Sequence, residues 1–138
     1  LRASNYAGIA FGHAGCAAVH ALSYPLGGGY HIPHGEANQL VFAATFRKYK
    51  EKQPIGKINE LEKLWGELLG VPADQALETA FALFDQVQPR KPLRDFGISD
   101  SEFRGFAEGV ISGRPRLLNN NYVPLTIDDM VAIYQSVY

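Results

Sequence analysis

The spacing of its apolar residues constrains the fold of this chain more than any other feature. Apolar side chains recur about every three to four residues along most of its length, as at Ile58, Leu61, Trp65 and Leu68, which is the period of one helix face. Nowhere do apolar and polar residues alternate as a half-buried strand requires. The pattern therefore predicts an all-α domain, a helical bundle without internal repeats.

Local signals set the expected helix boundaries. Ser99 is followed by Glu102, and Thr126 by Asp129, which is the spacing of a capping box at the start of a helix. The second pair is a weaker variant, because Asp is shorter than Glu. With the apolar spacing, the sequence predicts helices over residues 3–23, 34–50, 58–69, 73–87, 100–112 and 127–137.

The first of these helices is rich in glycine. Gly8, Gly12 and Gly15 stand at offsets of four and three, so they share one helix face. Each glycine inside a helix costs up to about 1 kcal/mol, which indicates that another backbone packs closely there. Apolar residues surround the rest of the segment, so we expect a helix buried on most sides. We expect Pro25 to end it and residues 26–33 to form a loop.

Composition limits the functions open to the chain. Its 138 residues, 46% of them apolar, allow one compact domain with a real core. The net charge of −1 lacks the cationic excess of a nucleic-acid-binding surface. A basic cluster surrounds Glu51 and is more typical of a solvated helix end; its members are Arg47, Lys48, Lys50 and Lys52. We therefore expect no nucleic-acid partner.

The cysteine count and the ends of the chain bear on its location. Cys16 is the single cysteine and has no internal disulfide partner, which favours a reducing cytoplasm. No apolar run approaches the roughly 20 residues that span a bilayer, and no signal peptide is recognisable, so we expect no membrane association. The chain opens at Leu1 without an initiating Met and enters an apolar helix at once, so we interpret it as a fragment of a longer protein.

The histidines are the candidate metal ligands. All four lie between positions 13 and 34, and imidazole is a common ligand of first-row divalent metals. A helix–loop–helix hairpin can bring His20 to His34, whereas His13 lies roughly 10 Å further along the first helix. His13 and His31 are therefore candidates only for the same cleft. Spacing leaves open that these are packing residues, and two imidazoles fall short of the usual three or four ligands.

Four short runs surround these histidines: Gly8-Ile9-Ala10-Phe11-Gly12-His13-Ala14-Gly15, Val19-His20-Ala21, Tyr24-Pro25-Leu26-Gly27-Gly28 and Ile32-Pro33-His34-Gly35-Glu36-Ala37-Asn38. Together they resemble the signature of iron-containing (group III) alcohol dehydrogenases. In that family a helix with one ligand histidine leads into a Pro-Leu-Gly turn and a Pro-His-Gly motif. The later run Lys91-Pro92-Leu93-Arg94-Asp95-Phe96-Gly97-Ile98 and the C-terminal helix are also similar, so the resemblance covers the whole chain.

The resemblance implies a fold and a metal site. Family members have an N-terminal nucleotide-binding α/β domain and a C-terminal helical domain of the dehydroquinate synthase-like fold, with the active site between them. An Asp and a His from an earlier helix usually hold the metal with two further His, which match His20 and His34. Residues 1–138 would be the C-terminal metal-binding helical domain. The implied cofactors are Fe²⁺ or Zn²⁺, and NAD or NADP bound mainly by the upstream domain.

Within the family, residues 17–25 and 116–121 look most like the 4-hydroxybutyrate dehydrogenase branch. Many relatives carry a second His four residues after the first ligand, with a role near the nicotinamide or in proton relay. This chain has Tyr24 there, which makes Tyr24 the candidate catalytic residue. His13 replaces a common Asn, and Phe11 matches an aromatic of the substrate pocket. Both are candidate pocket residues, although core packing explains Phe11 equally well.

The resemblance implies reversible hydride transfer between a nicotinamide and a small alcohol or aldehyde, with the metal as Lewis acid. The expected pair is 4-hydroxybutyrate and succinic semialdehyde, in a complete enzyme that we expect to be a homo-oligomer. The carboxylate of this substrate needs a binding partner, for which Arg114, Arg116 and residues 119–121 are candidates. The two arginines are equally consistent with a solvated surface pair.

Two alternatives remain for the function. One is a zinc-dependent polyol dehydrogenase of the glycerol dehydrogenase type, which shares the architecture but differs in sequence around the ligands. The other, for the chain alone, is a non-catalytic helical module. Because these residues contain half of the ligand set and no nucleotide-binding loop, we expect the isolated chain to be inactive and to bind metal weakly.

Overall fold

The computed structural model describes residues 1–138 as helices joined by turns, with no strand, which confirms the predicted all-α class. Its elements in chain order are α1 (Arg2–Ala14), α2 (Ala18–Tyr30), α3 (His34–Lys52), α4 (Lys57–Leu69), α5 (Ala73–Val87), η1 (Leu93–Phe96), η2 (Asp100–Glu102), α6 (Phe103–Gly113), α7 (Pro115–Leu118) and α8 (Ile127–Gln135). No helix is both long and apolar enough to cross a lipid bilayer.

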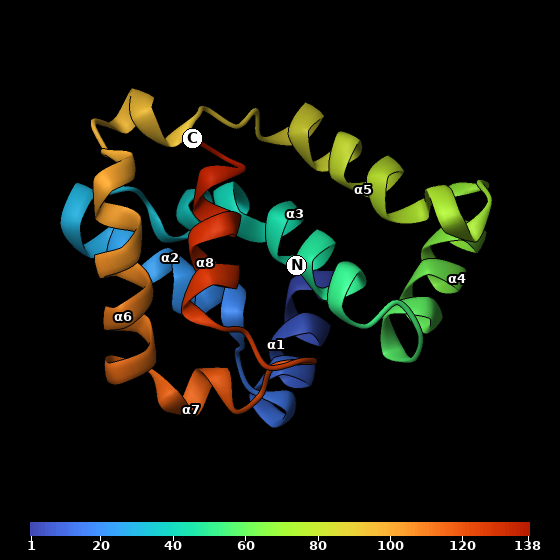
Figure 1. Ribbon diagram of the computed structural model, residues 1–138. Helices are drawn as coiled ribbons and strands as arrows, with labels where there is room; N and C mark the ends of the chain where they lie inside the picture. Colours follow the sequence, from blue (N-terminus) through green and yellow to red (C-terminus); the bar gives the residue numbers. More distant parts are fainter.

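Helix α2 lies at the centre of the packed body. It contacts α3 on one side and α6 on another, and α6 in turn packs on α8 (Figure 1). The main core joins these four helices through side chains such as Leu22, Leu40, Phe103 and Tyr134, all almost inaccessible to solvent. The α4–α5 hairpin extends away from α6 and packs on α3 through a smaller apolar cluster of Ala43, Ile58, Leu77 and Phe81.

Both predicted capping boxes are present. The Ser99 N–H donates to Glu102 Oε2 over 2.9 Å, and the Thr126 N–H donates to Asp129 Oδ2 over 2.8 Å. In the second box the Asp129 N–H also donates to Thr126 Oγ1, so the shorter Asp closes it completely. The first box opens with a 3-10 turn at Asp100–Glu102 before α6 begins. The expected helix over 100–112 is therefore right in position but mixed in type.

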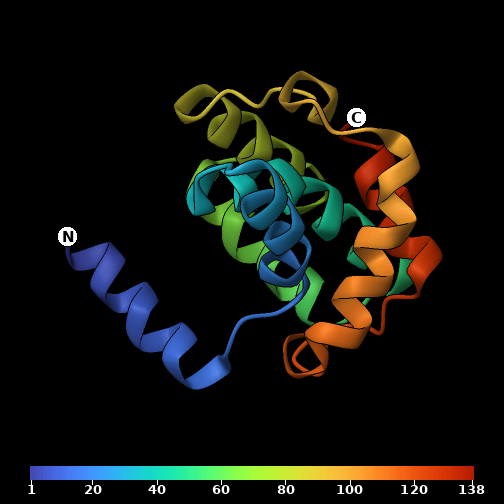
Figure 2. The ribbon, with the colours of Figure 1, turned by 90° about the vertical axis from the view of Figure 1, so that its left-hand side faces the viewer.

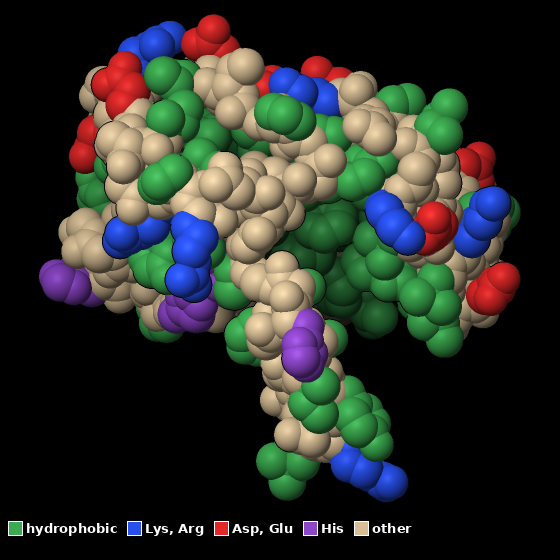
Figure 3. Space-filling view, turned by 90° about the horizontal axis from the view of Figure 1, so that it is seen from below, with side chains coloured by type: hydrophobic (Ala, Val, Ile, Leu, Met, Phe, Trp, Pro, Cys, Tyr) green, Lys and Arg blue, Asp and Glu red, His purple; other side chains and the backbone are tan.

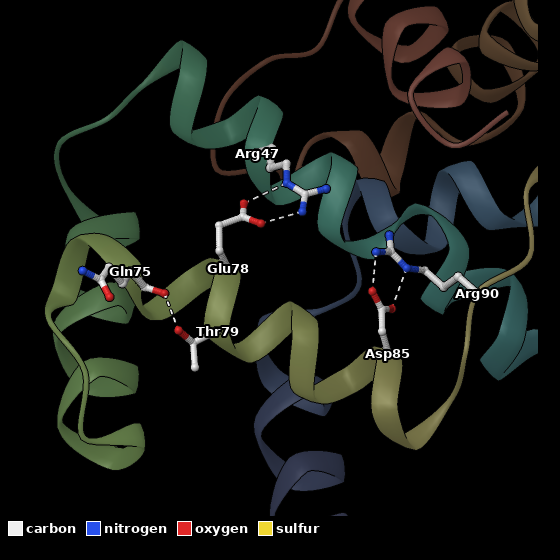
Figure 4. A network of polar contacts seen from close by, with 6 residues as sticks. All are labelled: Arg47, Gln75, Glu78, Thr79, Asp85 and Arg90. Atoms are coloured by element: carbon white, nitrogen blue, oxygen red, sulfur yellow. Dashed lines mark hydrogen bonds and ion pairs between the residues drawn. The ribbon is translucent and has the colours of Figure 1, made fainter.

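Ion pairs join α3 to α4, α5 and α8, and others form within α3 and at the end of α5. Arg47 on α3 forms a two-pronged pair with Glu78 on α5, and Arg90 forms another with Asp85 at the end of α5 (Figure 4). The other three residues of the basic cluster also meet carboxylates, in the pairs Lys48–Glu51, Lys50–Glu62 and Lys52–Asp129. Every cation that the sequence grouped here is thus paired with an acidic side chain of the same chain.

The expected single helix over 3–23 is wrong, because the chain turns at residues 15–17 and forms two helices. Gly15 has φ of 77°, a conformation that side chains disfavour, and a Cβ there would lie 2.5 Å from Asn120 Nδ2. The same amide donates to the Cys16 carbonyl over 3.0 Å. At least Gly15 therefore serves the turn rather than helix packing.

The expected stop at Pro25 and the loop over 26–33 are also wrong. Pro25 lies inside α2, which continues through three glycines to Tyr30 and ends at His31 in a left-handed conformation, with φ of 54°. A proline inside a helix costs about 3 kcal/mol, whereas burying each leucine contributes about 1.5–3 kcal/mol. Leu22 and Leu26, both at 0% exposure, flank Pro25, so tertiary packing outweighs the local penalty.

The apolar pattern of the first helix predicted burial on most sides, and this prediction is wrong. Helix α1 has no buried residue and extends from the body as an arm with the N-terminus at its free end (Figure 2). Tyr6, Ile9 and Phe11 are 66%, 55% and 57% exposed. The pattern that predicted burial is real, but no helix of this chain packs against it.

Candidate metal centre

The fold brings His20 and His34 together. The expected helix over 3–23 would place His20 near a helix end, but His20 lies in the first turn of α2. His34 is the first residue of α3. Their ring centres are 5.3 Å apart. Metal–nitrogen bonds of about 2.1 Å at a roughly tetrahedral angle place two imidazole centres about 5 Å apart. The pair therefore has the spacing of two ligands of one ion.

The surroundings of the pair favour neutral imidazoles. Burial lowers the pKa of His20, and the neighbouring His34 lowers it further. Asn38 Nδ2 lies 3.1 Å from His34 Nε2. An amide nitrogen only donates, so this contact uses the lone pair of His34 Nε2, and a metal ion bound at Nε2 would replace the hydrogen bond from Asn38. The donor set thus fits a borderline divalent cation such as Fe²⁺ or Zn²⁺.

Asn38 is a site residue that the sequence reasoning missed. It stands four residues after His34 on α3, so the two side chains share one helix face. Its Oδ1 is buried and has no hydrogen-bond partner within the chain, which is unusual for a polar atom. The i, i+4 spacing from a candidate ligand was the available signal.

Tyr24 lies beside the histidine pair, as a candidate catalytic residue should. It follows His20 by one turn of α2, and its ring centre is 6.5 Å from that of His34. The side chain is 44% exposed, and its hydroxyl makes no hydrogen bond within the chain. The guanidinium of Arg114 covers one face of the ring, with Cζ 4.6 Å from the ring centre.

The other candidates lie elsewhere. Phe11 and His13 are on the exposed arm α1 and are not brought to the histidine pair. His31 is the exposed C-cap of α2. The side chains of Asn120 and Asn121 are used in structure: Asn120 binds the Cys16 carbonyl, and Asn121 Oδ1 accepts from the Ala18 N–H over 2.7 Å.

The chain contains no group of three or more His, Cys, Asp or Glu side chains placed to hold a metal ion. The face from which α1 projects shows a histidine beside Lys or Arg side chains, and a hollow lined by apolar side chains next to the arm (Figure 3). His20 and His34 thus form an incomplete donor set at an open surface.

Comparison with known proteins identifies the architecture to which this site belongs. Residues 1–138, the whole chain, match the family described as "Fe-containing alcohol dehydrogenase family, C-terminal". The chain belongs to this family. The resemblance inferred from the motifs around His20 and His34 is therefore confirmed at the level of the family.

Several members of the iron-containing family are similar in sequence and in structure. The 4-hydroxybutyrate dehydrogenase of Clostridium kluyveri is 50% identical over 135 residues, and the long-chain-alcohol dehydrogenase 1 of Geobacillus thermodenitrificans is 34% identical over 139. Each match covers 98% of this chain. An alcohol dehydrogenase from Oenococcus oeni has a similar structure, with a TM-score of 0.73 and 27% identity over 96% of the chain.

The matches cover only part of each relative. The chain spans 36% of the Clostridium kluyveri protein, 35% of the Geobacillus protein and 35% of the Oenococcus oeni structure. The rest of each relative has no counterpart in residues 1–138.

Proposed function

We propose that this chain is the C-terminal, metal-binding part of a nicotinamide-dependent alcohol dehydrogenase that interconverts 4-hydroxybutyrate and succinic semialdehyde. The observation that carries the proposal is the 5.3 Å pairing of His20 and His34 in a chain of the iron-containing family. The 50% identity to a 4-hydroxybutyrate dehydrogenase supports the choice of substrate. Because the chain spans about a third of that relative, the activity is proposed for the complete protein.

His20 and His34 would hold the metal through neutral imidazole nitrogens. Their spacing and the lowered pKa of His20 suit this role. Fe²⁺ or Zn²⁺ bound there supplies a Lewis acid that polarises an alcohol or carbonyl oxygen. The remaining ligands would come from the upstream part of the protein, where NAD or NADP would also bind.

Four further side chains would contribute to the site. Asn38 hydrogen-bonds His34 Nε2 and would keep the ring in place until a metal ion takes that nitrogen. Tyr24 lines the open side, and its free hydroxyl can pass a proton between the substrate and water. Phe11 and His13 would line the substrate pocket once α1 packs against the upstream part. We expect the complete enzyme to act in the cytoplasm as a homo-oligomer.

Replacing His20 tests the proposal in the complete protein. The His20→Ala change should remove metal retention and lower kcat/KM with succinic semialdehyde and NADH by more than about 100-fold. Metal content, measured after anaerobic purification, distinguishes Fe²⁺ from Zn²⁺ and gives a readout independent of turnover. Residues 1–138 alone should bind either ion weakly and show no turnover.

His31→Asn is the matched control. His31 is exposed and its ring pairs with neither His20 nor His34, and Asn tolerates its left-handed conformation, so metal content and rate should stay near those of the parent. A His20→Ala enzyme with normal metal content and rate would overturn the ligand assignment. A parent enzyme that ignores succinic semialdehyde but reduces uncharged aldehydes would overturn the substrate assignment alone.

A further inference from the structure

Arg114 occupies a position that the fold itself does not explain. It is the C-cap of α6, and the only hydrogen bond of its side chain runs from Nη1 to the carbonyl of its neighbour Gly113, over 3.2 Å. It takes part in none of the seven ion pairs, whereas Arg47, Arg90 and Arg104 each meet a carboxylate. A guanidinium cannot lose its charge, so Arg114 presents an unpaired cation.

Tyr24 positions this cation next to the candidate metal centre. The Arg114 Cζ lies 4.6 Å from the centre of the Tyr24 ring, within the range of a cation–π contact. The same ring lies 6.5 Å from His34. With Nη1 on the Gly113 carbonyl, Nε and Nη2 make no hydrogen bond within the chain, and that edge of a guanidinium can bind a carboxylate with two parallel hydrogen bonds.

A groove beside Tyr24 contains no other charge. It has a volume of about 480 Å³ and lies between α2 and α6, and Arg114 is its only charged lining residue. Its walls are mostly glycine and apolar side chains: Gly28 and Gly29 on α2, and Gly105, Phe106, Gly109 and Gly113 on α6. A Cβ added at any of these lining glycines would meet nothing within 4 Å, so the groove is open.

The distances allow a short ω-hydroxy acid to bridge the two groups. The His34 ring centre and Arg114 Cζ are at most about 11 Å apart, given their separations of 6.5 Å and 4.6 Å from the Tyr24 ring. An extended four-carbon hydroxy acid is about 6 Å long, so at most about 2.5 Å remains at each end, which a polar contact can span. An acid of this length can therefore reach both ends at once.

We propose that Arg114, held against Tyr24, binds the carboxylate of an ω-hydroxy acid and so selects this substrate class over uncharged alcohols. The inference rests on the proposed function, because it assumes that the reacting end of the substrate lies at His20 and His34. Of the earlier candidates, Asn120 and Asn121 are engaged with backbone groups, and Arg116 makes no contact with Tyr24. Asn119 lines a different pocket, beside Leu118 and Leu125. Arg114 is the candidate that the geometry selects.

The test compares charged and uncharged substrates in the complete protein. Arg114→Gln should lower kcat/KM for 4-hydroxybutyrate by about 10- to 200-fold, mostly through KM, as expected for loss of a charge-assisted hydrogen-bond pair worth about 1.5–3 kcal/mol. The same variant should change kcat/KM for 1-butanol less than about threefold. Arg114→Lys keeps the charge but not the planar fork, so its loss should be intermediate. Arg116→Gln is the matched control and should behave like the parent.

Binding gives a second readout. Calorimetric titration of the complete protein with butyrate, which has the carboxylate but no hydroxyl, should show weaker binding to Arg114→Gln than to the parent. Equal losses on both substrates, or unchanged butyrate binding, would overturn the role of Arg114 while leaving the proposed function intact. A parent enzyme without activity on 4-hydroxybutyrate would instead contradict the proposed function itself.

Discussion

Helices α1 and α2 are neighbours of equal length, 13 residues each, and they differ completely in burial. α2 buries Ala18, Ala21, Leu22, Ser23 and Leu26, whereas α1 buries nothing. Both are apolar and rich in small residues, and α2 even contains a proline. Apolar content therefore does not decide which helix enters the core. The presence of a packing partner does, and only α2 has one within this chain.

The two helices also differ in how their ends are held. No side chain caps the start of α1. The first N–H of α2, from Ala18, donates to Asn121 Oδ1, which lies 103 positions away. The hydroxyl of Tyr134, which lies on α8, donates to the Leu22 carbonyl over 2.8 Å. Distant parts of the chain thus stabilise α2, which is why it tolerates Pro25 and three consecutive glycines.

Truncation of one apolar side chain in each helix gives the largest expected contrast. Leu22→Ala should lower the free energy of unfolding by about 2–5 kcal/mol, because it leaves a cavity at a position with 0% exposure. Ile9→Ala on α1, at 55% exposure, should change it by less than about 0.5 kcal/mol. Denaturant titration of this chain measures both, and similar losses would mean that α1 is packed in solution.

Removing the Asn121 side chain tests the hold on the start of α2. Asn121 Oδ1 accepts from the Ala18 N–H and from the hydroxyl of Tyr49 over 3.0 Å. Burial raises the pKa of Tyr49 to about 12, so this phenol stays a donor and would lose its acceptor. Asn121→Ala should therefore cost about 1–3 kcal/mol in denaturant titration.

Asn119→Ala is the control for this change. Asn119 is exposed, and its side chain makes no hydrogen bond in the chain, so its loss should be within about 0.5 kcal/mol. If both asparagine variants are equally destabilised, then the turn as a whole, and not the cap of α2, accounts for the effect.

Low pH should give the smallest difference between the two regions. α1 contains no carboxylate, whereas ion pairs of several carboxylates stabilise the packed body. The hydrogen bonds from Arg47 lower the pKa of Glu78, and those from Arg90 lower the pKa of Asp85. The unfolded carboxyls have pKa values of about 4, and above that pH the two ion pairs contribute their full stability. This stability is lost as the pH falls through the lower pKa values of the folded carboxyls. Stability should be flat from neutral pH to about 5 and then decline.

The double variant Glu78→Gln, Asp85→Asn should flatten that acid decline by no more than about 1 kcal/mol per pair, because these side chains are 60% and 35% exposed. Denaturant midpoints measured between about pH 7 and pH 3 check this. An acid decline of equal size in parent and variant would assign it to other carboxylates, such as Asp129.

Local signals predicted much of the fold. The expected helix over 73–87 coincides with α5, and the starts at Ser99 and Thr126 lie where their capping boxes placed them. These features depend on residues within one or two turns of each other. The errors at Gly15, Pro25 and α1 share a different cause, since each depends on what a distant segment does. Asn120 defines the first, the packing of α2 overrides the second, and the third depends on α1 burying no residue within this chain.

The candidate site divides in the same way. The sequence by itself determined the all-α class through its apolar spacing, and the family and the candidate ligands His20 and His34 through short motifs whose residue order is informative. Only the tertiary structure decided that the two rings are 5.3 Å apart and that Arg114 lies over Tyr24. These contacts join residues 14 and 90 positions apart, and side-chain distance across helices is a property of packing that local sequence does not encode.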